Sequence, residues 1–288
     1  LQGVKEQTEE GEGISISRIE VETEEAAQKL QKPVGHYITL DAPELTNRPL
    51  DLFEQVSKSL ATELARLLEG VGPQATVLVV GLGNRAITSD SLGPKVAEQV
   101  YVTRHVTQYL PDAVSKPIRS VCAVAPGVLG VTGIETMEIV QGVVERLKPD
   151  IILAVDALAS RRAARISTTI QLTDTGISPG SGVGNERKGL NEATFGVPVL
   201  AVGVPMVVYA TTISQDTISL IADETGLHSD EDKLRALAEK VSEEHLGSMI
   251  VTPKDVDQIA TDMSRVLADG INMALFGAEY DEVRMLIA

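Results

Sequence analysis

Two aspartates in this sequence stand where a carboxyl group can take part in acid–base chemistry. Asp90 lies in the glycine-rich turn after the apolar run at residues 76–80, and Asp156 directly follows the apolar run at residues 151–155. If these runs are parallel strands, both carboxyl groups emerge at the edge of the sheet where ligands bind in open α/β folds. Two carboxyl groups that lie close together share a proton, because they cannot both ionise cheaply. An aspartate at a strand end is also commonly a turn or helix-cap residue, and the pattern alone leaves that alternative open.

The elements that must position these aspartates are predicted by runs of apolar residues. Four mostly apolar runs predict strands, and the first, third and fourth of them lack polar alternation, which is typical of parallel strands buried on both faces. They cover residues 76–80, 118–124, 151–155 and 199–204. Apolar residues at helical spacing predict a helix over residues 50–68, which should pack on the sheet. We therefore expect an α/β fold: a single domain, residues 1–288, with a mostly parallel central sheet flanked by helices, plus small peripheral strands.

The turn after residues 76–80 carries the polar residues closest to Asp90. Gly81 and Gly83 allow the chain to turn sharply at the end of the strand. Asn84 and Ser89 follow in the same turn, and we expect them to stand with Asp90 at the mouth of a cleft. The turn is therefore predicted to form half of an active site.

A nucleotide-binding interpretation of the same turn is weaker. Gly81, Gly83 and Ala86 satisfy the G-x-G-x-x-G/A pattern in which a helix amino terminus receives a pyrophosphate. Proline favours the first turn of a helix, and Pro94 places that helix too far along the chain for such a cradle. Asp90 would also repel a phosphate. We therefore predict no cofactor at this turn.

The composition and net charge limit the kinds of molecule that we expect this chain to bind. The chain of 288 residues has a formal net charge of −16 at pH 7 and one cysteine. Its negative field repels nucleic acid and anionic membranes, so we expect no direct nucleic-acid partner and no membrane partner. A single cysteine cannot form an intrachain disulfide, which is typical of a cytoplasmic protein. The sequence has neither a run as long as a membrane span nor the features of a signal peptide.

Peripheral segments are predicted from local composition. Residues 1–13 are rich in glutamate and glycine and should be mobile, because they have little apolar surface to bury. Residues 14–21 alternate between apolar and polar side chains, which predicts an edge strand with residues 37–40 as its partner. Residues 231–245 are polar with a helical pattern, and we expect residues 226–247 to form a projecting arm.

Several motifs in a characteristic order resemble the germination protease family of endospore-forming bacteria. The resemblance covers nearly the whole chain, and it depends on the order and spacing of the motifs rather than on any one of them. The motifs are VVGLGN (79–84), LGPK (92–95), TRH (103–105), APGVLGVTGIET (125–136), VDALA (155–159), PGSGVGNERK (179–188) and VTPKDVD (251–257).

The resemblance implies a fold, an activity and a site. The fold is one shared with hydrogenase maturation endopeptidases, and the activity is degradation of small acid-soluble spore proteins in the spore core by an atypical aspartic mechanism. The family's two essential aspartates match Asp90 and Asp156, and no metal or cofactor is implied. A homotetramer and synthesis as a zymogen are also implied. Within this reading, the Asn84 amide and N–H groups of the turn are candidates to polarise the scissile carbonyl.

The glycine-rich loop at residues 176–188 is the predicted lid of this site. Its glycines make it adaptable, and Arg187 and Lys188 would meet an acidic peptide substrate. Arg187 is equally compatible with a solvated surface charge.

Two other functions stay open from the sequence. The first is a metal-dependent maturation-type peptidase, in which the two carboxylates join a histidine around nickel. His105 and His228 flank Asp156 in the sequence with no histidine between them, so the third ligand is hard to supply. The second is a non-enzymatic nucleotide-binding or assembly protein that reuses the fold.

Overall fold

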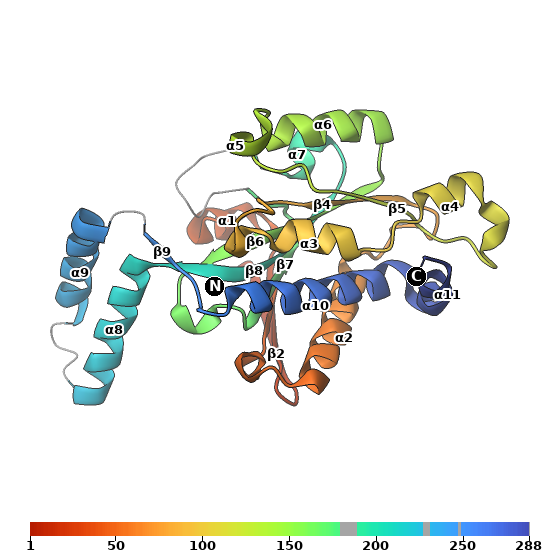
Figure 1. Ribbon diagram of the computed structural model, residues 1–288. Helices are drawn as coiled ribbons and strands as arrows, with labels where there is room; N and C mark the ends of the chain where they lie inside the picture. The colour runs from red at the N-terminus through yellow and green to blue at the C-terminus, as the bar shows by residue number, and fades with distance from the viewer. Residues whose placement is uncertain (179–188, 227–230, 247–248, 288) are drawn as a thin grey trace.

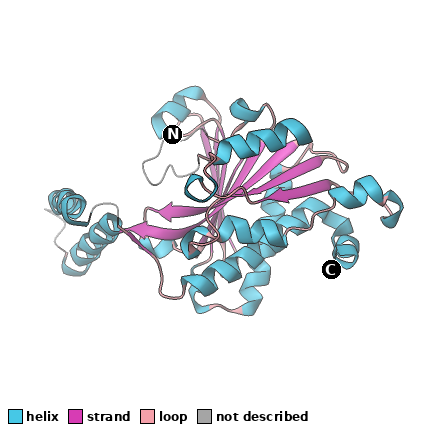
Figure 2. Cartoon of the chain, turned by 45° about the horizontal axis from the view of Figure 1, so that its top comes forward, coloured by secondary structure: helices cyan, strands magenta, loops and turns pink. Residues whose placement is uncertain are grey.

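A single large sheet runs through the molecule in the computed structural model, which describes residues 1–178, 189–226, 231–246 and 249–287 (Figures 1 and 2). Its strand order is β1-β2-β3-β7-β8-β6-β4-β5, and β9 pairs with β8. The strands are β1 (Val4–Glu10), β2 (Ser15–Val21), β3 (Gly35–Asp41), β4 (Thr76–Gly81), β5 (Ser120–Val124), β6 (Ile151–Ser160), β7 (Thr169–Thr173), β8 (Val199–Tyr209) and β9 (Ile250–Val251).

Helices cover both faces of the sheet, which confirms the predicted α/β class. They are α1 (Glu24–Leu30), α2 (Leu50–Leu67), α3 (Leu92–Gln99), α4 (Arg104–Tyr109), α5 (Leu129–Thr132), α6 (Thr136–Leu147), α7 (Glu192–Phe195), α8 (Ala210–Thr225), α9 (Glu231–Leu246), α10 (Val256–Phe276) and α11 (Tyr280–Ile287). Within the described residues, none of these helices has the length and apolar character needed to cross a membrane.

The four strands β5, β4, β6 and β8 pair in parallel and form the half of the sheet that carries both aspartates. Alternate residues of β4 enter two separate cores. Val77 and Val79 pack with α2, α3 and α10, whereas Leu78 and Val80 pack with α6 (Figure 1). Because both faces are covered, the strand is apolar throughout, as the sequence pattern predicted.

The other half of the sheet is antiparallel, so the sheet as a whole is mixed. Residues 1–13 were predicted to be mobile, but Val4–Glu10 form β1, and the edge position assigned to residues 14–21 belongs to β1 instead. The prediction of mobility considered only how little apolar surface these residues can bury. The strand is held by a backbone ladder to β2 and by ion pairs such as Lys5–Glu22 and Arg18–Glu9, neither of which needs an apolar face.

Strands β6 and β8 extend well beyond the apolar runs that predicted them. Asp156 was expected at a strand end, but β6 continues to Ser160 and pairs with β8 along this length, with Asp156 opposite Gly203. Pro205, which follows the predicted run at residues 199–204, also lies inside β8, opposite Leu158. The register shifts between Leu158 and Ala159, and such an irregularity accommodates a proline that cannot donate to the ladder.

Helices α8 and α9 pack against each other and extend away from the sheet on one side (Figure 1). The described part of the predicted arm at residues 226–247 lies in this hairpin, which begins earlier in the chain, at Ala210. Residues 227–230 and 247–248 lie outside the described part of the chain.

Candidate active site

Asp156 is a nearly buried carboxyl group within β6. Its side chain points to the face of the sheet covered by α6, since the alternate residues Ile152 and Ala154 belong to that core. The residue is only 8% exposed, and its Oδ1 atom accepts a hydrogen bond of 2.8 Å from the backbone N–H of Ala157. Burial and then the charge of Asp90 raise the pKa of Asp156 to about 7, against the opposing effect of the Ala157 N–H.

Asp90 is held by the tight turn that follows β4. A Cβ atom on Gly83 would lie 2.1 Å from the backbone oxygen of Asp90, and the Gly83 φ angle is +118°, so only glycine fits there. The Oδ2 atom of Asp90 accepts a hydrogen bond of 2.7 Å from the backbone N–H of Asn84. Burial raises the pKa of Asp90 above its ordinary value, and the Asn84 N–H opposes that rise.

The turn is fastened to the strand that carries Asp156. The backbone N–H of Leu82 donates to the oxygen of Val155 at 2.8 Å. A Cβ atom on Gly93 would lie 2.5 Å from the same oxygen, so the first turn of α3 also lies directly on β6. These contacts bring the two predicted aspartates together, and the influence of Asp90 on the pKa of Asp156 is the electrostatic result.

A contact with α10 holds the Asp90 turn from the other side. The hydroxyl of Thr88 donates to the Oδ1 atom of Asp257 at 2.8 Å. In addition, the ammonium group of Lys95 donates to the hydroxyl of Thr261 at 3.2 Å and joins α3 to α10. Sequence reasoning missed the Thr88–Asp257 contact, because nothing in the chain indicates that residues so far apart meet.

The remaining predicted site residues have different outcomes. Asn84 is at the site, but its backbone N–H binds Asp90 and its Oδ1 atom accepts from Ala86, so its visible role is to shape the turn. Ser89 is half-buried in the same 3-10 turn as Asp90. Arg187 and Lys188 lie outside the described residues.

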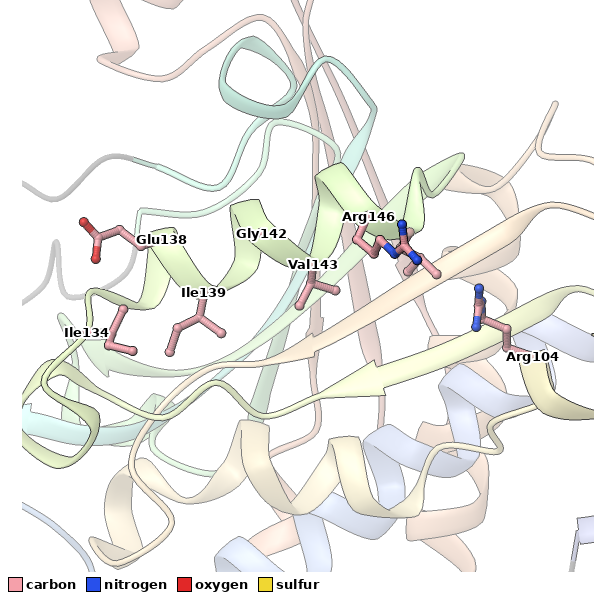
Figure 3. A pocket seen from close by; sticks show the side chains of 8 residues that line it. Arg104, Ile134, Glu138, Ile139, Gly142, Val143 and Arg146 are labelled. Carbon is pink, nitrogen blue, oxygen red and sulfur yellow. The ribbon is translucent and has the colours of Figure 1, made fainter.

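A cleft of about 460 Å³ lies across the sheet, and neither Asp90 nor Asp156 is among the residues that line it. Gly203, the register partner of Asp156, and Leu158 line one end of it. Its floor continues over β8, β7 and β3 to Tyr37. Gly176 to Ser178 form part of its wall, so the first residues of the predicted loop do border the cleft. A second hollow, shown in Figure 3, runs along α6 between Ile134 and Arg146 and is lined by neither aspartate.

The side chains around Asp90 and Asp156 also determine whether a metal ion could bind there. In the described part of the chain, no three side chains of His, Cys, Asp or Glu come close enough together to hold a metal ion. His105 is exposed on α4. The described residues therefore do not fit the three-ligand nickel arrangement considered from the sequence, and no chemical step is derived through a metal.

Comparison with known proteins identifies relatives over nearly the whole chain. The sequence model of the germination protease family matches residues 1–241. The germination protease of Clostridium acetobutylicum is 45% identical over 288 residues, covering 95% of this chain and 88% of the relative. That of Caldanaerobacter subterraneus is 45% identical, with 96% and 89% covered. That of Bacillus cereus is 39% identical, with 96% and 87% covered.

Among solved structures, a NiFe hydrogenase maturation protease of Thermococcus kodakarensis matches with 16% identity and a TM-score of 0.38, covering 73% of this chain and 98% of that one. The family match and the identities to its members decide the assignment: this chain belongs to the germination protease family and is a protease of the hydrolase class.

Proposed function

We propose that this chain is an endopeptidase that cleaves small acid-soluble spore proteins, with Asp90 and Asp156 as the acid–base pair. One observation carries the proposal. A nearly buried carboxyl group whose pKa is raised to about 7 lies within the electrostatic influence of a second carboxyl group at the carboxyl edge of a parallel sheet. Each carboxyl group accepts one backbone N–H, and these bonds leave its second oxygen without a hydrogen bond within the described residues.

The two environments assign different roles to the two aspartates. Asp156 keeps its proton, because burial and the neighbouring charge both disfavour its ionised form. Asp90 receives a backbone N–H from Asn84, which favours its ionised form. Below about pH 7 the proposed mechanism therefore places the proton on Asp156, and Asp90 is the base.

Peptide hydrolysis then follows from one water molecule and this one proton. Asp90 removes a proton from the water while the water oxygen attacks the scissile carbonyl carbon, which gives a tetrahedral intermediate. Asp156 donates its proton to the leaving nitrogen as the C–N bond breaks. The products are a carboxylic acid and an amine, and transfer of the proton from Asp90 to Asp156 restores the starting pair.

The cleft over β8, β7 and β3 is the proposed binding site for the extended substrate chain. It begins at Gly203 and Leu158, next to Asp156, and it is open enough for a peptide to lie along it. Arg187 and Lys188 follow the Gly176–Ser178 wall in the chain, and we retain them as proposed contacts for acidic side chains of the substrate.

The test is incubation of the purified protein with small acid-soluble spore proteins, followed by mass spectrometry of the products. Wild type should give defined fragments, and Asp156→Asn should give none. The same assay after exhaustive treatment with a metal chelator addresses the alternative nickel mechanism. If chelation abolishes cleavage and added nickel restores it, the nickel mechanism replaces the proposed one. If wild type gives no fragments at all, the result supports the non-enzymatic alternative.

Assembly and location belong to the same proposal. We propose a homotetramer in the cytoplasm of the spore. Exposed apolar side chains on the α8–α9 hairpin support association with further copies, among them Leu220, Ile221, Leu234 and Leu237. Sedimentation analysis should give the mass of four chains, and Leu237→Glu should reduce it.

A further inference from the structure

An open groove of about 760 Å³ runs along α6, on the side of the sheet toward which Asp156 points. Three side chains of the helix, Ile139, Val143 and Leu147, line it at four-residue spacing and therefore form one stripe. Ile134, just before the helix, continues the stripe and is 47% exposed (Figure 3). The α6 groove is thus an apolar surface that the chain leaves partly open to water.

The glycine in the middle of the groove points to a ligand that approaches the helix closely. Gly142 lies in the interior of α6, where glycine is less favourable than alanine. Its φ angle is not positive, and a Cβ atom on it would meet nothing within 4 Å among the described residues. Neither backbone conformation nor packing within the described chain therefore calls for glycine here. A peptide backbone lying directly against the helix would, because glycine leaves room for such an approach.

Two arginines stand together at one end of the α6 groove, whereas Glu138 stands near the other (Figure 3). Arg146 comes from the last turn of α6 and Arg104 from the first turn of α4. Within the described residues, neither guanidinium group takes part in an ion pair or a hydrogen bond. The chain has 41 acidic and 25 basic side chains, so its overall field repels an acidic ligand. The groove therefore favours a carboxylate at its arginine end and an uncharged or basic segment near Glu138.

The dyad lies between the α6 groove and the cleft over β8, β7 and β3. Leu158, at the end of the cleft, lies two residues after Asp156 on β6 and so faces the same side of the sheet. On the other side of the dyad, β5 is two strands away from β6, which is roughly 10 Å. Because β5 is parallel to β4 and leads into α6, Ile134 marks the end of the groove at the carboxyl edge of the sheet. One extended chain can therefore follow the cleft, pass the dyad and enter the groove at Ile134.

The length of the groove sets the length of chain that it holds. Helix α6 has 12 residues, so it is about 18 Å long. An extended peptide of about five or six residues spans that distance. The arginines thus lie well beyond the residues that flank the scissile bond.

We propose that the α6 groove binds a second segment of the protein substrate, remote from the scissile bond. Apolar side chains of this segment lie on the Ile139–Val143–Leu147 stripe, its backbone passes Gly142, and a carboxylate binds Arg104 and Arg146. This inference rests on the proposed peptidase function and adds a way to select intact proteins over short peptides.

The experiment compares steady-state constants for two substrates. One is an intact small acid-soluble spore protein, and the other is a peptide of about six residues around one of its cleavage sites, too short to reach the arginines. The double variant Arg104→Gln/Arg146→Gln should raise KM for the intact protein about tenfold at low salt and leave kcat in place. Both constants for the short peptide should stay unchanged. The matched control is Lys29→Gln/Lys58→Gln, which removes the same charge from α1 and α2.

A second variant tests the groove without changing charge. Leucine is a better helix former than glycine, and a Cβ atom at this position meets nothing within the described chain, so Gly142→Leu should not lower the melting temperature. Its side chain would occupy the groove, so KM for the intact protein should rise about tenfold and the short peptide should be cleaved as before. A residue with a merely structural role would not separate the two substrates.

Four results would overturn the proposal, and they differ from one another. Wild-type KM values for the intact protein in both groove variants would show that the substrate does not bind there, although cleavage itself stands. Equal losses on both substrates would mean that the variants disturb the dyad. A smaller sedimenting mass of either variant would assign the groove to a second copy of the chain. If wild type cleaves neither substrate, the proposed function fails and this inference fails with it.

Discussion

The two aspartates have the same side chain, but the regions that carry them differ. Asp156 sits within a long strand, just past the end of its ladder with β4 and opposite Gly203 of β8, and its carboxyl group is nearly buried. Asp90 sits in a short 3-10 turn, and it is placed by backbone contacts with Gly83 and Asn84. Each carboxyl group accepts one backbone N–H, from Ala157 or from Asn84, but Asp156 is the more deeply buried of the two. Burial raises the pKa of both groups, and the charge of Asp90 raises that of Asp156 further, to about 7.

Removing either carboxyl group should have the largest effect on cleavage. Asp90→Asn and Asp156→Asn keep the side-chain shape, but an amide cannot exchange a proton at the working pH. Each should lower kcat by about 10⁴-fold, and the double variant should be no worse than either one, because the two groups act as a unit. Single-turnover cleavage measures this. A folded Asp156→Asn protein with near wild-type activity would contradict the proposed mechanism.

The same two variants should also differ in how they change the free energy of unfolding. The pKa of Asp156 is about 7 in the folded protein and 3.8 ordinarily, so the folded state binds this proton more tightly. Its stabilising contribution is present below about pH 4 and is lost as pH rises through about 7. Asp156→Asn should therefore raise the free energy of unfolding by up to about 4 kcal/mol at pH 8 and by much less at pH 4.

Urea denaturation at the two pH values gives this difference. Asp90→Asn is the matched comparison. Its free energy of unfolding should rise less, because the substitution also removes an ionised carboxyl group that the Asn84 N–H stabilises. Equal gains at pH 4 and pH 8 for Asp156→Asn would show that its carboxyl group is not protonated in the folded protein.

The turn can be disturbed without touching either carboxyl group. Gly83→Ala places a Cβ atom against the backbone oxygen of Asp90 and forces a conformation that alanine avoids. A displacement of the base by about 1 Å should lower kcat by roughly 10²-fold. Gly72→Ala, in the loop before β4, is the control, since nothing lies within 4 Å of the added atom. If both variants kept wild-type rates, the tight approach at Gly83 would have no role in catalysis.

The pH dependence of cleavage should report the protonation of the strand aspartate. Activity requires the proton on Asp156, whose pKa is about 7. The rate should therefore fall by about tenfold per pH unit above that value. Initial rates between pH 6 and pH 9 test this, with circular dichroism to confirm that the protein stays folded. A rate that stays constant up to pH 9 would assign the acid to another group.

The sequence predicted the parts of this site that depend on local pattern. Apolar runs located β4 and β6, and the glycines located the turn, so Asp90 and Asp156 were found together. The extension of β6 past Asp156 was missed because residues 157–160 are paired with β8, which is a long-range contact without a local signal. Strand β1 was missed for the same reason. The positive φ angle of Ser167 likewise has no signature in its residue type.

The contact between the turn and α10 is the weakest constraint on Asp90 and should give the smallest effect. The Thr88 hydroxyl donates to Asp257, and Thr88→Val removes the donor while keeping the side-chain shape. An exposed hydrogen bond of this kind contributes about 0.5–1 kcal/mol, so the variant should lower kcat by about threefold. Asp257→Ala removes the acceptor and should have the same effect. Because the two residues share one bond, the double variant should also be only about threefold slower. Gln99→Leu is the control, since it removes the link from Gln99 to Ser264 of α10 without touching Thr88 or Asp257. If the effects of Thr88→Val and Asp257→Ala multiplied instead, each residue would act on Asp90 by a separate route, and the turn would not be held by α10.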